Sequence, residues 1–165
     1  MKPKVFGERN KVRPYCRNIS AHHIMIDMQR IVLDTNCLVA SISRTSETYD
    51  VWKGLYEGRY VLCVSNEILM EYQEIIAKKT TAVIAENVIQ YLINSNYVEF
   101  VTPYYHFQLI TSDKDDNKFV DCAIAAGARY IVSNDKHFNV LKQISFPFVE
   151  VMSLATFLQI IRSGR

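Results

Sequence analysis

Four carboxylates stand where strands are expected to end or helices to begin: Asp34, Glu71, Asp116 and Asp135. A parallel α/β sheet collects the carboxyl ends of its strands along one edge, so side chains far apart in the sequence meet there. Because clustered carboxylates repel one another, such a group favours a hard divalent cation such as Mg²⁺ or Mn²⁺. The four acids therefore predict a metal-dependent phosphoryl-transfer enzyme.

Each of these acids has a structural role open to it beside the chemical one. Asp34, Asp116 and Asp135 stand at predicted helix N-caps, where a carboxylate accepts bonds from backbone N–H groups, and both roles can hold together. Glu71 lies one turn into a predicted helix beside apolar neighbours, and its alternative is an ordinary surface glutamate.

A second set of polar residues is predicted to support the acids by orienting them or a metal-bound water: Asn36, Asn117, Asp121 and Ser133. Asp121 shares a helix face with Asn117, four residues earlier, and is a further candidate carboxylate. Asp113 and Asp115 are interpreted as solvated loop residues, and His137 as structural.

The charge of the chain is unevenly distributed. Its net charge is +2, yet residues 1–30 hold seven basic and two acidic side chains, so the remainder carries −3. We expect residues 1–27 to be a basic, flexible leader, with residues 28–165 as the folded domain and Met28 as a candidate start. A mildly acidic domain suits a site neutralised by metal and gives no nucleic-acid signal from charge alone.

Neither secretion nor membrane insertion is signalled. The four cysteines form no Cys-x-x-Cys pair, and Cys37, Cys63 and Cys122 lie in apolar stretches typical of small core residues. The N-terminus has no apolar segment typical of a signal peptide, and no run approaches transmembrane length. We expect a reducing, cytoplasmic location.

Strands and helices are predicted to alternate along the chain. The strands are expected at 30–34, 60–64, 97–101, 130–132 and 148–151, and the helices at 36–41, 46–57, 65–79, 82–93, 117–126, 138–141 and 153–161. This order is typical of a three-layer α/β/α domain with a mainly parallel sheet of about five strands.

The motifs at the strand ends resemble those of a PIN-domain protein: IVLDTN at 31–36, Ser65 to Glu71, DNKF at 116–119 and YIVSND at 130–135. The resemblance covers about residues 30–160. Within this family the chain is similar to the VapC-like toxins of bacterial toxin–antitoxin systems. It implies Mg²⁺- or Mn²⁺-dependent RNA cleavage, with Asp34, Glu71, Asp116 and Asp135 as ligands. Ser133 keeps the hydroxyl of the usual threonine.

The resemblance also implies a homodimer and a small antitoxin that covers the acidic pocket. Apolar residues on the helices expected between 36 and 57 are candidates for that surface: Val39, Ile42, Val51, Trp52, Leu55 and Tyr56. Basic residues expected near the cleft are Lys114, Lys118, Arg129 and Lys136.

Three other interpretations compete with a toxin. An RNA-processing or quality-control nuclease would use the same acids. A catalytically silent RNA- or protein-binding module is disfavoured because all four acids are present. A phosphatase of the aspartyl-phosphate type would need a second aspartate two residues after Asp34, where Asn36 stands.

Overall fold

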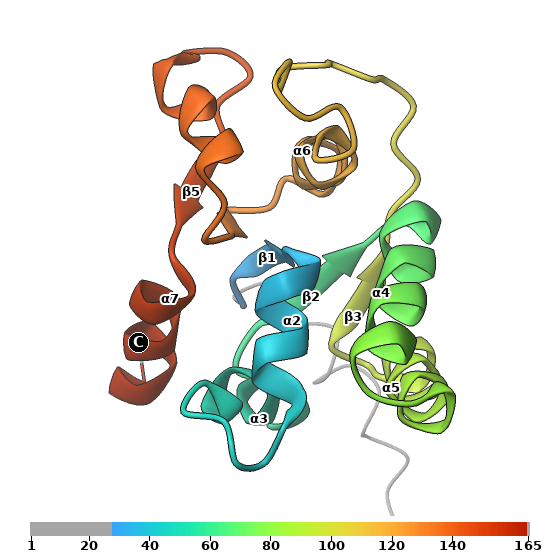
Figure 1. Ribbon diagram of the computed structural model, residues 1–165. Coiled ribbons are helices and arrows are strands. Elements are labelled where there is room, and N and C mark those ends of the chain that lie inside the picture. The colour runs from blue at the N-terminus through green and yellow to red at the C-terminus, as the bar shows by residue number, and fades with distance from the viewer. Residues whose placement is uncertain (1–27, 165) are drawn as a thin grey trace, which may run out of the picture.

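A five-stranded parallel sheet forms the centre of the computed structural model, which describes residues 28–164 (Figure 1). Its strand order is β3-β2-β1-β4-β5, and every neighbouring pair is parallel. The strands are β1 (Arg30–Leu33), β2 (Val61–Val64), β3 (Val98–Phe100), β4 (Tyr130–Val132) and β5 (Glu150–Met152). The predicted α/β class with a parallel sheet is confirmed. The predicted leader, residues 1–27, lies outside the described residues.

Helices connect the strands: α2 (Thr35–Ile42), α3 (Tyr49–Tyr56), α4 (Asn66–Lys79), α5 (Ala82–Asn94), α6 (Asn117–Ala126), the 3₁₀ helix η1 (Lys136–Gln143) and α7 (Leu154–Ser163). The chain moves outward from β1 to β3 and then returns to β4 through α6. Because parallel crossovers are right-handed, this reversal places α6 on the opposite face of the sheet from α2–α5. No helix within residues 28–164 is long and apolar enough to cross a membrane.

Local capping explains where several helices begin and end. Ser65 Oγ accepts from the backbone N–H of Ile68 at 3.3 Å, and Ser153 Oγ accepts from that of Thr156 at 3.1 Å. Gly127 ends α6 in the left-handed region at φ 58°, a conformation that glycine adopts without steric cost.

Several predicted boundaries differ from the structure by one to three residues, and three of them illustrate why. β1 ends at Leu33 rather than at residue 34, because Asp34 already caps α2. α3 begins at Tyr49 rather than at residue 46, since the preceding residues form a turn. β5 begins at Glu150 rather than at residue 148, because Phe148 points into solvent.

The core is continuous from the sheet into the helices on both faces. Cys37, Cys63 and Cys122 are buried and free, as expected, and burial raises the pKa of each thiol to about 12. Such thiols act as small apolar side chains rather than nucleophiles.

The predicted partner surface on the early helices is largely closed within the chain itself. Val51 and Leu55 are fully buried, so assigning them to an exposed surface was wrong. Trp52 and Tyr56 both pack on Tyr91 of α5, with ring centroids 5.1 and 5.9 Å from that of Tyr91. Of these, Tyr56 keeps a mostly exposed side chain, and Val39 and Ile42 are half-buried.

Candidate metal centre

Asp34 is fixed at the carboxyl end of β1 by its own backbone. Its N–H donates to Val132 of β4 at 3.0 Å, which keeps the residue within the sheet. Its Oδ1 accepts from the N–H of Asn36 at 3.0 Å, and its Oδ2 accepts from Ser133 Oγ at 2.6 Å. The carboxylate, 7% exposed, therefore caps α2 and faces the strand end at the same time.

Ser133 links the carboxylate of Asp34 to the backbone of Asp135. While its hydroxyl donates to Asp34, the same oxygen accepts from the backbone N–H of Asp135 at 3.0 Å. Asp135 caps η1 by accepting from the N–H of His137 at 2.9 Å. One hydroxyl thus ties together two strand ends that lie 99 residues apart in the sequence.

Glu71 reaches the site from α4 and is held between two partners. Its Oε1 accepts from Thr35 Oγ1 at 2.6 Å, and its Oε2 forms an ion pair with Lys118 of α6. Thr35 follows Asp34 directly, so this hydrogen bond draws Glu71 to the end of β1. The sequence analysis expected Lys118 only near the cleft; the structure shows that its ammonium group pairs with Glu71.

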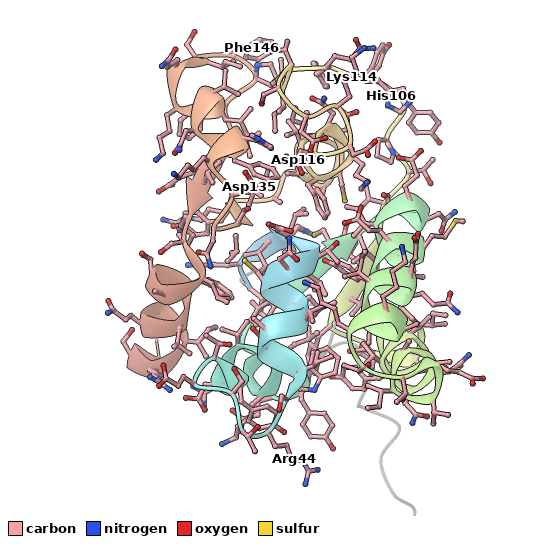
Figure 2. All side chains as sticks on the ribbon, viewed as in Figure 1. Arg44, His106, Lys114, Asp116, Asp135 and Phe146 are labelled. Atoms are coloured by element: carbon pink, nitrogen blue, oxygen red, sulfur yellow. The ribbon has the colours of Figure 1, made fainter. Side chains whose placement is uncertain are left out.

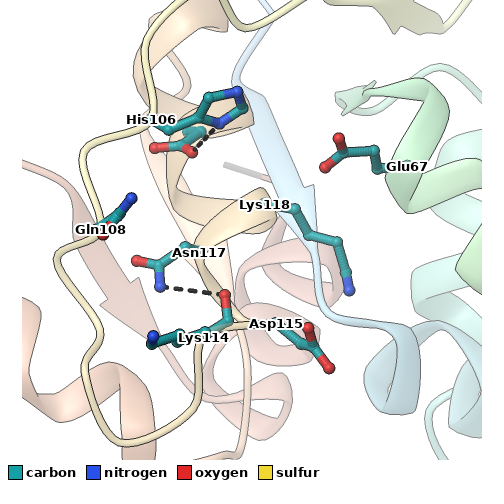
Figure 3. Close-up of a pocket in the computed structure, with 8 residues that line it drawn as sticks. Glu67, His106, Gln108, Lys114, Asp115, Asn117 and Lys118 are labelled. Carbon is teal, nitrogen blue, oxygen red and sulfur yellow. Dashed lines mark hydrogen bonds and ion pairs between the residues drawn. The ribbon is translucent and has the colours of Figure 1, made fainter.

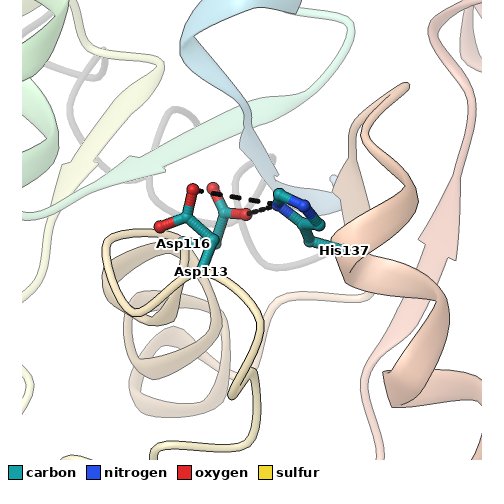
Figure 4. Close-up of side chains that lie close together, drawn as sticks. All are labelled: Asp113, Asp116 and His137. Carbon is teal, nitrogen blue, oxygen red and sulfur yellow. Dashed lines mark hydrogen bonds and ion pairs between the residues drawn. The ribbon is translucent and has the colours of Figure 1, made fainter.

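Asp116 lies in a group that the sequence interpretation only partly identified (Figure 4). His137 Nδ1 lies 3.1 Å from Asp116 Oδ2, 3.8 Å from Asp113 Oδ2 and 3.4 Å from Asp135 Oδ1. Asp113 and His137, interpreted from the sequence as solvated and structural, thus both lie next to the predicted acids. Asp116 stands at the N-cap of α6 but makes no capping bond, because its carboxylate faces the imidazole instead.

The sequence did contain a signal for these two residues. Asp113 precedes Asp116 by three residues in one turn, and His137 follows Asp135 by two. The ligand atoms of Asp113, Asp116 and His137 all lie within 4.8 Å of one another. Nothing in the sequence shows that the two segments meet; the packing of η1 beside α6 decides it.

The carboxylates act on one another electrostatically. Burial raises the pKa of Asp34, and the charges of Asp135 and Glu71 add to this, although the hydrogen bonds from Ser133 and Asn36 oppose it. Burial likewise raises the pKa of Asp116 to about 6, with Asp113, Asp135 and Asp34 contributing and the His137 bond opposing. All four predicted acids thus belong to one electrostatic group.

This group fits a divalent cation by its donor chemistry. Carboxylate oxygens are the ligands that Mg²⁺ and Mn²⁺ prefer, and one imidazole also suits Mn²⁺. The pKa values of Asp34 and Asp116 are raised first by burial, and repulsion from the neighbouring carboxylates adds to it. A cation would relieve that repulsion. Figure 2 shows Asp116 and Asp135 near each other at the same end of the molecule.

The other predicted supporting residues have different contacts. Asn36 is exposed, and its Oδ1 accepts from Lys79 at 2.8 Å. The side chain of Asn117 is buried and bonds both the backbone N–H and the carbonyl oxygen of Ile110. Asp121 is buried under the loop before α6 and is not among the charges that act on Asp34 or Asp116. Asn117 and Asp121 therefore hold that loop.

Two cavities open beside the acids. One of about 340 Å³ is lined by Glu67, His106, Gln108, Lys114, Asp115, Asn117, Lys118 and Asp121 (Figure 3). A second, of about 700 Å³, shares Lys118 with the first and reaches Glu71. Lys114 and Lys118 thus line the cleft as expected, whereas Arg129 lies over the ring of Tyr130 at the opposite end of β4.

Comparison with known proteins agrees with this architecture. The model of the PIN domain family matches residues 30–137. The fold is similar to that in the crystal structure of VapBC2 from Rickettsia felis bound to a DNA fragment from their promoter, with a TM-score of 0.54 and 18% identity over 76% of this chain and 98% of that one. No curated protein matches. Because the family model spans most of the chain, including all four acids, this chain belongs to the PIN domain family.

Proposed function

We propose that this chain is a metal-dependent endoribonuclease and the toxin component of a toxin–antitoxin pair. One observation supports the nuclease proposal most: Ser133 links the carboxylate of Asp34 to the backbone of Asp135, and Glu71 and Asp116 belong to the same electrostatic group. Membership of the PIN domain family supports a nuclease, because members of this family generally are nucleases. The likeness in fold to VapBC2 is what motivates the toxin role.

Asp34, Glu71, Asp116 and Asp135 would hold one or two Mg²⁺ or Mn²⁺ ions, with Asp113 and His137 as further donors. A bound ion supplies an activated water and stabilises the charge that develops on the attacked phosphate. Ser133 fixes the orientation of Asp34 and so sets the geometry of the centre. Lys118 lies between Glu71 and the cavity, where its ammonium group would attract an RNA phosphate.

RNA cleavage by the purified chain is the direct test. We expect fragments in the presence of Mn²⁺ or Mg²⁺ and none with excess chelator, and sequencing the fragment ends would define the cleavage site. Single-stranded DNA of matched sequence is the control for substrate class. Cleavage that persists in chelator would refute metal dependence. A protein that begins at Met28 should cleave equally well if residues 1–27 are dispensable.

The toxin role requires a partner and a physiological effect. We propose a homodimer in the cytoplasm, inhibited by a small protein encoded by a neighbouring gene. Expression of this chain alone should arrest growth, and coexpression of the neighbour should restore it and give a complex in size-exclusion chromatography. A monomeric nuclease that is harmless to cells and copurifies with no partner would point instead to RNA processing.

A further inference from the structure

The connection between β3 and α6 is irregular yet firmly anchored. Residues 101–110 contain no helix or strand. The backbone N–H of Phe107 donates to Asp121 Oδ1 at 3.0 Å, and the ring of His106 bonds Asp121 Oδ2 at 3.0 Å. Since Asp121 is only 3% exposed, these bonds tie the loop to a buried point on α6.

A second anchor follows three residues later. Asn117 accepts from the N–H of Ile110 at 2.9 Å and donates to its carbonyl oxygen at 2.7 Å, while the Ile110 side chain is buried. Between the two anchors Gln108 has φ 51°, a left-handed conformation that is uncommon for a residue with a Cβ. The loop is therefore tied to α6 at residues 106–107 and 110, directly after Tyr104 and Tyr105.

This fixed loop presents aromatic rings to solvent. Tyr104 is 86% exposed and Tyr105 is 77% exposed, and the next two residues, His106 and Phe107, are exposed as well. Within residues 28–164 neither tyrosine packs on another aromatic ring. Large rings at such exposure bury almost no apolar surface, so packing within the chain does not account for them.

The residue that follows the two tyrosines lines a cavity beside α6. His106 lines the 340 Å³ cavity together with Gln108, Lys114 and Lys118, and Lys118 also pairs with Glu71 (Figure 3). The cavity is as large as the smaller ligand sites of proteins. Figure 2 places His106 and Lys114 at the same end of the molecule as Asp116. The two tyrosines therefore directly precede a residue of the cavity that holds both lysines, and Lys118 links that cavity to Glu71.

We propose that Tyr104 and Tyr105 form a stacking platform for unpaired bases of single-stranded RNA, next to the phosphate that the acidic centre cleaves. This inference rests on the proposed nuclease function and assigns two residues that would contact its RNA substrate. Exposed rings on a rigid backbone stack on any base, and neighbouring lysines follow the phosphates. The cavity is lined entirely by polar and charged residues, Lys114 and Lys118 as well as Glu67, Asp115 and Asp121, which favours a polar nucleic-acid chain over an apolar peptide as the occupant.

Fluorescence anisotropy with a short, labelled, mixed-sequence RNA tests the platform. Asp34→Asn protein with Mn²⁺ is the background, so that binding is measured without cleavage. We expect the Tyr104→Leu/Tyr105→Leu pair to raise Kd by roughly tenfold or more. The Tyr104→Phe/Tyr105→Phe pair, which keeps the rings, should bind normally. Both pairs should keep the melting temperature, since the residues are exposed.

A matched control and an altered probe isolate stacking. Tyr56, 69% exposed, precedes β2 at the opposite end of the sheet, and Tyr56→Leu should leave Kd unchanged. An RNA of the same length with abasic residues keeps its phosphates but offers nothing to stack. It should bind the parent protein weakly and show no further loss with the leucine pair.

The outcomes separate this inference from the proposed function. If the parent protein binds RNA and the unsubstituted chain cleaves it, but the leucine pair changes neither, the platform is refuted while the nuclease stands. A protein partner would then be the occupant of the rings. If the unsubstituted chain neither binds nor cleaves RNA with Mn²⁺, both ideas fall together.

Discussion

The carboxylates of Asp34 and Asp135 accept from backbone N–H groups, and that of Asp34 also from a serine hydroxyl, whereas Glu71 is held by Thr35 and Lys118 and Asp116 by His137. The first pair, which we call the strand side, follows β1 and β4 directly. The second pair, the helix side, lies on α4 and at the start of α6. The strand side is fixed by the fold itself. The helix side is held by side chains that can exchange their partner.

The difference suggests a division of labour within one centre. Capping bonds on the strand side orient the carboxylates whether or not a cation is bound. Lys118 and His137 occupy carboxylate oxygens of Glu71 and Asp116 that a cation would otherwise bind. Once a cation displaces them, both side chains could turn toward substrate. Substitutions on the strand side should therefore abolish or misalign the centre, and those on the helix side should retune its affinity for metal.

The largest loss of RNA cleavage is expected for Asp34→Asn. The amide keeps the shape and can still accept from the N–H of Asn36, but it removes charge that a metal needs. Cleavage should fall by at least about a hundredfold, which corresponds to about 2.7 kcal/mol of transition-state stabilisation. The melting temperature should stay level or rise, because burial disfavours the native charge. Full activity in this variant would remove Asp34 from the centre.

Metal binding should be visible without RNA. Mn²⁺ at about a hundred times its Kd would stabilise the native state by about 2.7 kcal/mol, or very roughly 5–10 °C for a chain of this size. Excess chelator should reverse the shift, as differential scanning fluorimetry would show. Asp34→Asn and Asp116→Asn should each reduce it strongly. An equal shift in all three proteins would place the cation elsewhere.

Ser133→Ala tests whether the hydroxyl that joins the strand side matters. Its loss leaves Asp34 Oδ2 and the Asp135 N–H without their bond, at a cost of about 1–3 kcal/mol in unfolding free energy. Cleavage should fall by about tenfold, because misorientation costs about 1.4 kcal/mol. Ser133→Thr keeps the hydroxyl and should retain both properties. Equal losses in the two variants would indicate a packing defect instead.

Lys118→Met should have the smallest effect, and it should strengthen metal binding rather than weaken it. Losing the ion pair with Glu71 should cost at most about 1 kcal/mol in the metal-free protein. Glu71 would then be free for a cation, so Mn²⁺ should bind a few times more tightly in calorimetry without RNA. Lys114→Met, in the same cavity but without a bond to Glu71, is the control. Weaker Mn²⁺ binding in Lys118→Met would contradict the idea of exchange.

Local pattern was sufficient for much of this protein. Short apolar runs and capping residues predicted the elements, and their alternation predicted a parallel sheet, because both depend on neighbours along the chain. The sheet in turn required Asp34 and Asp135 to meet at one edge, since parallel strands share a direction. The family motifs lie on these same segments, which is why the fold and the four acids were found together.

Tertiary structure alone decided the partners of those acids. The pairing of Glu71 with Lys118, and of Asp116 with His137, depends on how α4, α6 and η1 pack, and no spacing encodes that. Packing also withdrew Trp52 from the expected partner surface by stacking it on Tyr91 of α5. The sequence by itself determined the strands and helices and the edge of the sheet at which Asp34 and Asp135 lie. Long-range contacts decided their charge environment, because electrostatic coupling depends on distance in space and not along the chain.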